Sequence, residues 1–233
     1  MIVSGIEIEI IKKDIKNMHL SVLPPLGKVH ISAPLNANDE AINLFAITKL
    51  GWIKNQIKNF ENQSRQTERE YIAGESHYVW GRRYRLELNF SNKGNYVEIH
   101  RNKLILTVRE KSTQSQREKF MNEWYRAELK AKFPEFVEKW EPIIGVQATA
   151  VGVKNMRTRW GTCNVKDKKV LLNLQLAKKP INCLEYVVVH ELVHLLEKNH
   201  TTVFVEYMDK FLPNWRMVKD ELNSFIMDRY LEE

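Results

Sequence analysis

The first half of the chain alternates apolar and polar residues with a period of two. The run IEIEIIKK, which begins at Ile6, shows this alternation, and it returns after residue 70 in YIAGESHYVWG, RRYRLELNF, NYVEIHR and KLILTV. Such alternation is typical of β-strands that bury one face. Turn signals at 24–27, at Gly81 and at 93–95 separate the runs, so we expect hairpins and, after residue 70, a meander.

Apolar residues at helical spacing predict one long helix in this half, at about 38–69, with Asn36 or Asn38 as its N-cap. A polar stretch at 109–117, REKSTQSQR, then marks the change to a mostly helical part. There we expect a helix at 115–140, strands at about 145–153, 156–163 and 169–175, and helices at 182–197, 201–211 and 215–230. No internal repeat is apparent in the sequence. The expected fold class is α+β, with a β-rich N-terminal region at 1–110 and a helix–sheet region at 111–233.

Composition narrows the class of protein. The 233 residues are 43% hydrophobic and 28% charged, which excludes a disordered or fibrous chain. The net charge of +7 suits an anionic partner such as nucleic acid, although the basic residues are spread along the chain. The two cysteines, Cys163 and Cys183, form no CxxC motif, so a reducing compartment is expected. Glu7 and Glu9 interrupt the apolar run that a signal peptide needs, and no apolar stretch is long enough for a membrane span. We therefore expect a cytoplasmic protein with no membrane partner.

The strongest chemical signal is the run His190-Glu191-Leu192-Val193-His194, which matches HExxH. Four residues along a helix bring the second histidine to about 40° from the first and about 6 Å along the axis, so both imidazoles can bind one ion. Glu191 projects to the same side, where it can reach a water on the metal without binding the metal itself. Asn182 as N-cap and Glu185 three residues later predict a well-defined start for this helix.

A catalytic zinc takes three protein ligands, and His200 is the third candidate. On a continuing helix it would point away from His194, so the helix has to end and the chain has to turn back. Residues 198–199 are the expected place, with Asn199 in the left-handed conformation.

This set of residues predicts peptide-bond hydrolysis by a metal-activated water. Three neutral imidazoles leave Zn²⁺ its full charge, which acidifies the water. Glu191 acts as general base and then passes the proton to the leaving amine. Arg159, Tyr186 and Tyr207 are candidates for stabilising the oxyanion, and the sequence does not choose among them.

The chain resembles the YgjP-like metallopeptidase family, a relative of the SprT and Wss1 zinc proteases. The residues that carry the resemblance are MRTRWGTC at 156–163, LLNLQL at 171–176, EYVVVHELVHLLEKNH at 185–200, and Phe204 with Pro213 beyond. In the front half, SAPL, GWI, YVWGRRYRLEL and EWYRAEL also fit. The resemblance implies a zincin-like metallopeptidase domain at 111–233 with HExxH on the active-site helix. It also implies zinc at His190, His194 and His200, with Glu191 as general base.

Three further residues are candidates for substrate binding. LLNLQL is expected to be an edge strand beside the active-site helix, where Asn173 and Leu174 would pair with an extended peptide. Arg159 would line the cleft or hold the sheet to the helix. An ordinary buried strand explains LLNLQL equally well.

The leading hypothesis is thus a zinc metallopeptidase that acts on peptides or proteins. Two alternatives stay open. One is a DNA-associated protease, suggested by the kinship and the positive charge. The other is a nucleic-acid-binding or adaptor protein with a catalytically idle zinc site, linked to a DNA-processing system.

Overall fold

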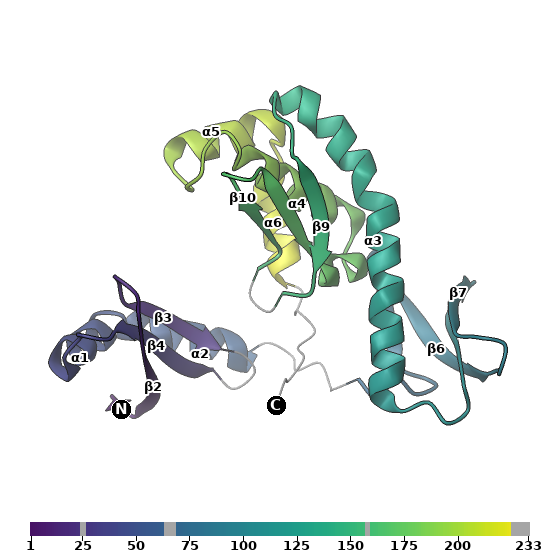
Figure 1. Cartoon of the computed structure of the whole chain (residues 1–233), viewed down its shortest axis with the longest axis horizontal. Helices are drawn as coiled ribbons and strands as arrows, with labels where there is room; N and C mark the ends of the chain where they lie inside the picture. Colours follow the sequence, from purple (N-terminus) through teal and green to yellow (C-terminus); the bar gives the residue numbers. More distant parts are fainter. Residues whose placement is uncertain (24–26, 63–68, 157–158, 225–233) are drawn as a thin grey trace. The chain divides into compact units, whose positions relative to one another are not determined.

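The computed structural model describes residues 1–23, 27–62, 69–156 and 159–224, which fall into two compact units, one before residue 63 and one from residue 69 on (Figure 1). The elements of the first unit are β1 (Ile2–Val3), β2 (Ile6–Lys13), β3 (His19–Leu23), β4 (Lys28–Pro34), α1 (Asp39–Thr48) and α2 (Leu50–Asn62). Those of the second are β5 (Ser76–Val79), β6 (Arg82–Phe90), β7 (Tyr96–His100), β8 (Lys103–Val108), α3 (Gln114–Ile144), β9 (Ala150–Lys154), β10 (Gly161–Asn164), β11 (Lys169–Asn173), the 3₁₀ helix η1 (Leu174–Lys178), α4 (Ile181–Val193), α5 (Thr202–Phe211) and α6 (Trp215–Ser224). The α+β class predicted from the sequence is confirmed.

The first unit is a four-stranded sheet with its own core. The strand order is β1-β2-β4-β3, with β2 parallel to β4 and the two outer pairs antiparallel. Alternation along β2 and β4 buries Ile8 and Ile31 completely, in one cluster with Ile42 of α1. The period of two therefore places one face of this sheet against its helices.

The helix expected at 38–69 is two helices in the structure. Asn38 is the N-cap of α1, and its side chain accepts a hydrogen bond from the amide of Ala41 at 2.8 Å. At Lys49 the backbone leaves the helical conformation and its amide bonds back to the carbonyls of Ala46 and Ile47. Residues 63–68, which the prediction included, lie outside the described residues.

The second unit begins with a sheet of the same topology. Its order is β5-β6-β8-β7, with β6 parallel to β8 and the two outer pairs antiparallel, followed again by helix. The predicted meander is wrong, because β8 lies between β6 and β7. Leu104 and Leu106 of β8 are fully buried whereas β7 is mostly exposed, so the more apolar strand takes the central position.

Helix α3 connects this sheet to the rest of the second unit. Thr113 begins it with a capping box, and Gly145 ends it in the left-handed conformation, with φ of 80°. The hydroxyl of Tyr125 donates to the carbonyl of Tyr78 at 3.0 Å, which fixes the helix to β5. Farther along, α3 contacts η1, β9 and α4.

One continuous core runs through the second unit. Leu86 and Leu106 of the sheet belong to the same buried cluster as Leu129 of α3 and Leu184 of α4. The division expected at residue 110 falls inside this unit, since the two compact units separate between residues 62 and 69.

The second half of this unit holds a three-stranded sheet beside α4. Its order is β10-β11-β9, with β11 antiparallel to β10 and parallel to β9. The prediction that this segment, LLNLQL, forms an edge strand is wrong, because β11 is central and its continuation forms η1. Among the described strands, β10 and β9 form the two edges of this sheet, and Arg126 of α3 donates to the carbonyl of Val153 in β9 at 2.8 Å.

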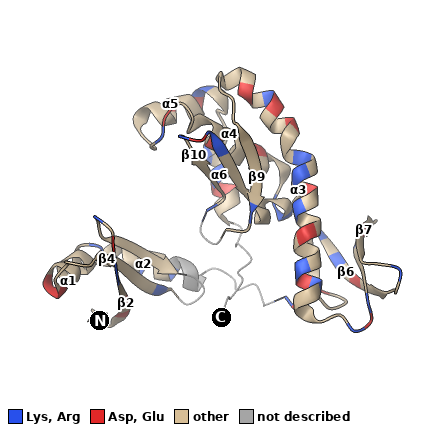
Figure 2. Ribbon diagram, viewed as in Figure 1, with Lys and Arg blue, Asp and Glu red and all other residues tan. Residues whose placement is uncertain are grey.

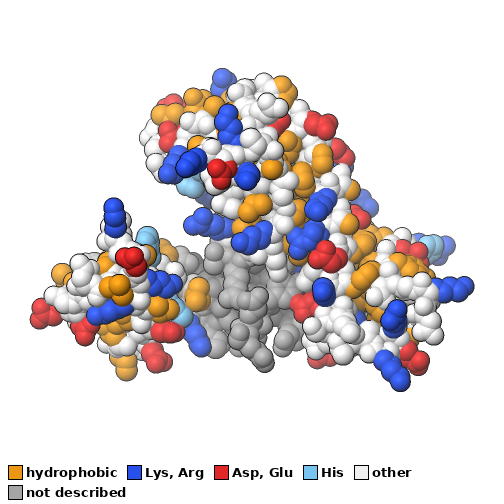
Figure 3. Space-filling view, viewed as in Figure 1, with side chains coloured by type: hydrophobic (Ala, Val, Ile, Leu, Met, Phe, Trp, Pro, Cys, Tyr) orange, Lys and Arg blue, Asp and Glu red, His pale blue; other side chains and the backbone are white. Residues whose placement is uncertain are grey.

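Charges on the described surface are mixed. Figure 2 shows Lys and Arg interspersed with Asp and Glu along α3. Over the face seen in Figure 3, basic side chains lie among acidic and apolar ones. None of the helices in the described residues has both the length and the apolar content that crossing a bilayer requires.

Candidate metal centre

Packing, rather than the predicted cap, sets the start of α4. The helix begins at Ile181 after Pro180, which makes no side-chain cap bond. The predicted capping pair is wrong because both side chains have other partners. Asn182 donates to the carboxylate of Glu221 at 2.8 Å, and Glu185 accepts from the indole of Trp140 at 2.9 Å.

Three histidines converge where α4 ends. The candidate ligand atoms of His190, His194 and His200 all lie within 4.8 Å of one another, and Nε2 of His190 is 3.0 Å from Nε2 of His200. The helix stops at Val193 with His194 as C-cap, four residues before the predicted end at 197, so the chain turns back early enough to return His200. Asn199 does not adopt a positive φ, so the expected left-handed residue is not what makes the turn.

A phenylalanine holds the three imidazoles together. The ring centroid of Phe204 lies 5.0 Å from that of His190, 4.7 Å from that of His194 and 4.8 Å from that of His200. The three imidazoles are 4.8 to 5.0 Å apart among themselves. Phe204 is itself buried, so the four rings form one close-packed group.

The protonation states suit metal binding. Burial, with the neighbouring His194 and His200, lowers the pKa of His190 to about 3, so this imidazole is neutral near pH 7. Nδ1 of His194 lies 3.1 Å from the carbonyl oxygen of Glu197. A carbonyl can only accept, so Nδ1 carries the proton and Nε2 keeps its lone pair for a ligand.

The spacing also fits a small tetrahedral ion. Zinc–nitrogen bonds are about 2.0–2.1 Å long, which places tetrahedral ligand atoms about 3.4 Å apart. Nε2 of His190 and Nε2 of His200 are 3.0 Å apart, and the three candidate ligand atoms lie within 4.8 Å of one another, so small side-chain adjustments bring them to this spacing. Within the described ranges, one group of three or more His, Cys, Asp or Glu side chains lies close enough to share a metal ion, and it consists of these three histidines.

Glu191 follows His190 in α4, and its side chain is almost completely buried. Only 4% of the residue is exposed, and burial raises its pKa to about 8, against a smaller lowering by Arg159. The backbone of β10 lies directly against this side chain at Gly161. The motif thus pairs neutral imidazoles with a carboxyl that titrates near neutral pH.

The predicted substrate contacts separate into two kinds. Asn173 and Leu174 are buried at the end of the central strand. The Asn173 amide donates to the carbonyls of Met156 and Arg159, at 2.8 and 2.6 Å, so it holds the segment before β10. Arg159 itself is exposed, and its side chain is available to a ligand.

The other two oxyanion candidates are engaged in ring packing. Tyr186 is stacked on Trp215, with centroids 6.4 Å apart, and is 6% exposed. Tyr207 is stacked on Phe211, with centroids 6.0 Å apart. Arg159 is therefore the most accessible of the three.

Two residues of this region were not predicted from the sequence to shape the site. Gly161 and Phe204 stood in the motifs as family markers with no assigned role. The signal for Phe204 was its place in the first turn of the helix expected at 201–211, directly after His200. No pattern in the sequence indicates that β10 touches Glu191.

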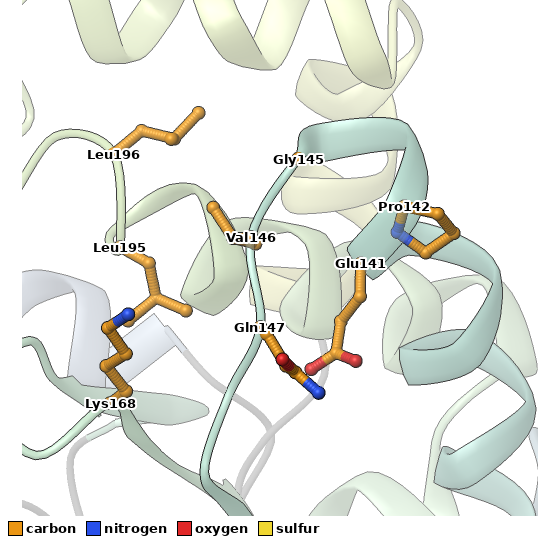
Figure 4. Close-up of a pocket in the computed structure, with 8 residues that line it drawn as sticks. All are labelled: Glu141, Pro142, Gly145, Val146, Gln147, Lys168, Leu195 and Leu196. Carbon is orange, nitrogen blue, oxygen red and sulfur yellow. The ribbon is translucent and has the colours of Figure 1, made fainter.

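A pocket of about 550 Å³ lies near the same end of α4, but none of the histidines nor Glu191 lines it. Figure 4 shows its lining residues, which come from the end of α3, the segment after it, the β10–β11 turn and the chain after His194. They are Glu141, Pro142, Gly145, Val146, Gln147, Lys168, Leu195 and Leu196.

Comparisons with known proteins give one match over most of the chain. A family model described as YgjP-like, metallopeptidase domain, matches residues 16–225. The metallopeptidase zymogen abylysin of Pyrococcus abyssi is similar at 19% identity and a TM-score of 0.36, over 38% of this chain and 90% of its own. The zymogen jannalysin of Methanocaldococcus jannaschii is similar at 17% identity and a TM-score of 0.36, over 40% and 94%. A search of curated proteins found no match.

Proposed function

The chain belongs to the YgjP-like metallopeptidase family, and we propose that it hydrolyses peptide bonds with zinc held by His190, His194 and His200. One observation carries the proposal: three imidazoles converge within 4.8 Å, and the residue that follows His190 in α4 is a glutamate whose side chain is buried. The family match supports peptide or protein substrates and does not support the DNA-associated alternatives. A cytoplasmic location stays a prediction.

The three histidines fit zinc because their ligand atoms lie close together, Phe204 packs against all three rings, and burial keeps His190 neutral near pH 7. When bound, zinc supplies Lewis acidity toward a carbonyl oxygen and acidifies a water molecule. The Glu197 carbonyl keeps the lone pair of His194 on Nε2, and the early end of α4 brings His200 to the other two histidines.

Glu191 is the proposed general base. Burial raises its pKa to about 8 in spite of the opposing charge of Arg159, and a divalent ion beside it would lower the pKa further. With the ion bound, the lowered pKa would leave the carboxyl ionised, so that it can take a proton from the attacking water and return it to the leaving amine. Its enclosure by β10 keeps other water away from that proton.

An extended substrate has one strand to pair with at this site. In the described residues β10 pairs only with β11, so its other edge has backbone groups for an incoming peptide. Because Gly161 of β10 lies on Glu191, a peptide on this edge passes close to the carboxyl. Arg159, just before β10, is placed to contact such a peptide. Asn173 and Leu174 would then act through β10 rather than by direct contact.

The test combines metal content with cleavage. The chain, purified without a metal-affinity tag, is measured for bound zinc and for cleavage of casein or a peptide library. We expect one zinc per wild-type chain, retention of zinc with a loss of about 10²–10⁴-fold in kcat for Glu191→Gln, and loss of zinc for His200→Ala.

Matched controls are an exposed histidine and an exposed glutamate elsewhere in the second unit. His100→Ala in β7 and Glu206→Gln in α5 should keep both zinc and activity. Zinc retained by His200→Ala, or full activity in Glu191→Gln, contradicts the proposal. Zinc bound by a wild type that cleaves nothing rules out the peptidase function and leaves only the metal site.

A further inference from the structure

The first residue of β10 is a glycine whose backbone does not require one. Six of the nine glycines have positive φ, which explains their identity by conformation. Gly51, Gly152 and Gly161 do not. A Cβ at Gly51 would meet nothing within 4 Å, and one at Gly152 would meet the flexible end of Leu171 at 3.1 Å.

Gly161 is different because the carboxyl group of Glu191 fills the space that a side chain at residue 161 would need. A Cβ there would lie 2.5 Å from Oε1, 2.7 Å from Cγ and 2.8 Å from Cδ of Glu191. These distances are shorter than any van der Waals contact between carbon atoms. The end of the Glu191 side chain therefore occupies the space where any other residue at position 161 would carry its Cβ, and the backbone of β10 lies directly against it.

The strand cannot easily move away to make room. Gly161 is paired with Leu172, which is fully buried in the central strand. Just upstream, the Asn173 backbone amide donates to the carbonyl of Trp160 at 2.8 Å, and the Asn173 side chain holds the carbonyl of Arg159. An added methyl group would therefore displace the Glu191 side chain rather than β10.

We infer that Gly161 is a positioning residue for Glu191: the absence of a side chain lets β10 lie on the carboxyl, fixing its orientation toward the three histidines. The inference rests on the proposed function for its catalytic consequence. Gly161 itself touches no reacting atom and acts through Glu191. Its identity thereby becomes a requirement of the reaction as well as of packing.

The first experiment is Gly161→Ala, with Gly152→Ala in β9 as the matched control. Both variants add one methyl group to a glycine of the same sheet with ordinary φ. A displacement of the carboxyl of about 1 Å lowers kcat by about 10²-fold, and we expect this loss in Gly161→Ala with zinc content retained and KM changed by less than about 3-fold. Gly152→Ala should keep kcat. Unchanged kcat in Gly161→Ala overturns the inference.

The second experiment does not depend on activity. Thermal unfolding is measured for wild type, Gly161→Ala, Glu191→Ala and the double variant. If the methyl group clashes with the carboxyl, the drop in Tm caused by Gly161→Ala disappears when Glu191 is replaced by alanine. The same drop in both backgrounds shows that the methyl meets something else and overturns the inference.

The two experiments also separate this inference from the proposed function. A wild type that binds zinc but cleaves nothing counts against the peptidase function, and the cycle of melting temperatures still decides whether Gly161 positions Glu191. Should Gly161→Ala fail to fold, the double variant with Glu191→Ala is expected to fold, and its failure to do so contradicts the clash.

Discussion

The two four-stranded sheets of this chain have the same strand order and the same directions, yet they have different roles in the structure. The sheet of the first unit packs on its own helices, α1 and α2, in a separate core. The sheet of the second unit shares one core with α3 and α4 and so supports the helix that carries HExxH. Topology alone does not determine whether such a sheet stands by itself or becomes part of a larger framework.

The difference is clearest at the first hairpin turn of each sheet. Both turns have two residues with positive φ, Ser4 and Gly5 at 48° and 78°, and Trp80 and Gly81 at 49° and 80°. A Cβ at Gly5 would meet nothing within 4 Å. The matching turn in the second sheet instead binds the segment that leads into α4.

Two backbone hydrogen bonds make this contact. The amide of Trp80 donates to the carbonyl of Ala177 at 2.9 Å, and that of Gly81 donates to the carbonyl of Lys178 at 3.3 Å. Pro180, which precedes α4, lies so close to Gly81 that a Cβ there would be 2.9 Å from its Cγ. The second sheet thus helps to set where α4 begins, whereas in the part of the chain that the structure describes the turn of the first sheet makes no such backbone hydrogen bonds.

The largest effects are expected from truncating equivalent core residues of the two sheets. Ile31 in β4 and Leu106 in β8 are both fully buried and paired with the second and third strands of their sheets. Each change to alanine should lower the free energy of unfolding of its own unit by about 2–5 kcal/mol. Hydrogen exchange resolved by peptide should show the loss in residues 1–62 for Ile31→Ala and in residues 69–224 for Leu106→Ala.

On mild heating, peptide cleavage should be lost at a lower temperature for Leu106→Ala than for Ile31→Ala. Only Leu106→Ala weakens the core that supports α4. Equal losses of activity from both variants would show that the two units are energetically coupled.

A smaller difference is expected between the two turn glycines. Alanine at a left-handed position costs about 1–2 kcal/mol, and this term is common to Gly5→Ala and Gly81→Ala. Gly81→Ala adds a clash with Pro180, so we expect about 1–3 kcal/mol of further destabilisation. Melting temperatures of the two variants measure the difference, and zinc content reports whether α4 has shifted. Equal melting temperatures would mean that the close approach of Pro180 to residue 81 adds nothing to the destabilisation.

The smallest effect concerns alkaline pH and is confined to the second unit, which contains both cysteines. Burial raises the pKa of Cys183 from 9.0 to about 12 and that of Cys163 to about 11. Above pH 9 the unfolded chain releases these protons while the folded chain keeps them, so stability decreases as pH rises from 9 toward 12. Melting temperatures measured between pH 8 and pH 10.5 should fall less steeply in Cys183→Ala than in wild type. A slope that the substitution leaves unchanged assigns the alkaline loss to other groups.

Local patterns predicted the elements of this fold better than the way they pair. Asn38 begins a helix as predicted because its side chain needs only the next turn of backbone. Asn182 does not act as a cap because Glu221, 39 residues away in the sequence, offers its amide a charged partner. The predicted meander is wrong for a similar reason. The buried side chains of β8 place this strand in the centre of the sheet, between β6 and β7, and the turn that precedes it does not decide its position.

The candidate site shows the same division. The pairing of His190 and His194 follows from helix geometry, whereas His200 joins them because α4 ends at Val193 and the chain turns back, and the structure brings all three side chains together. The contact between Gly161 and Glu191 joins residues 30 positions apart and leaves no periodic pattern in the sequence. The repeated topology was also invisible, because the two sheets share the pattern of pairing and turn conformation but few residues.

The short separation between His194 and His200 affects the order in which this site can form. A metal that joins them closes a loop of only a few residues, and the entropy lost on closing a loop rises with its length. Zinc can therefore capture the reversal after α4 while more distant parts of the chain are still unfolded. With zinc bound as proposed, its removal would free the segment between α4 and α5 without opening the core, so the ion would cross-link this segment locally rather than hold the whole fold together.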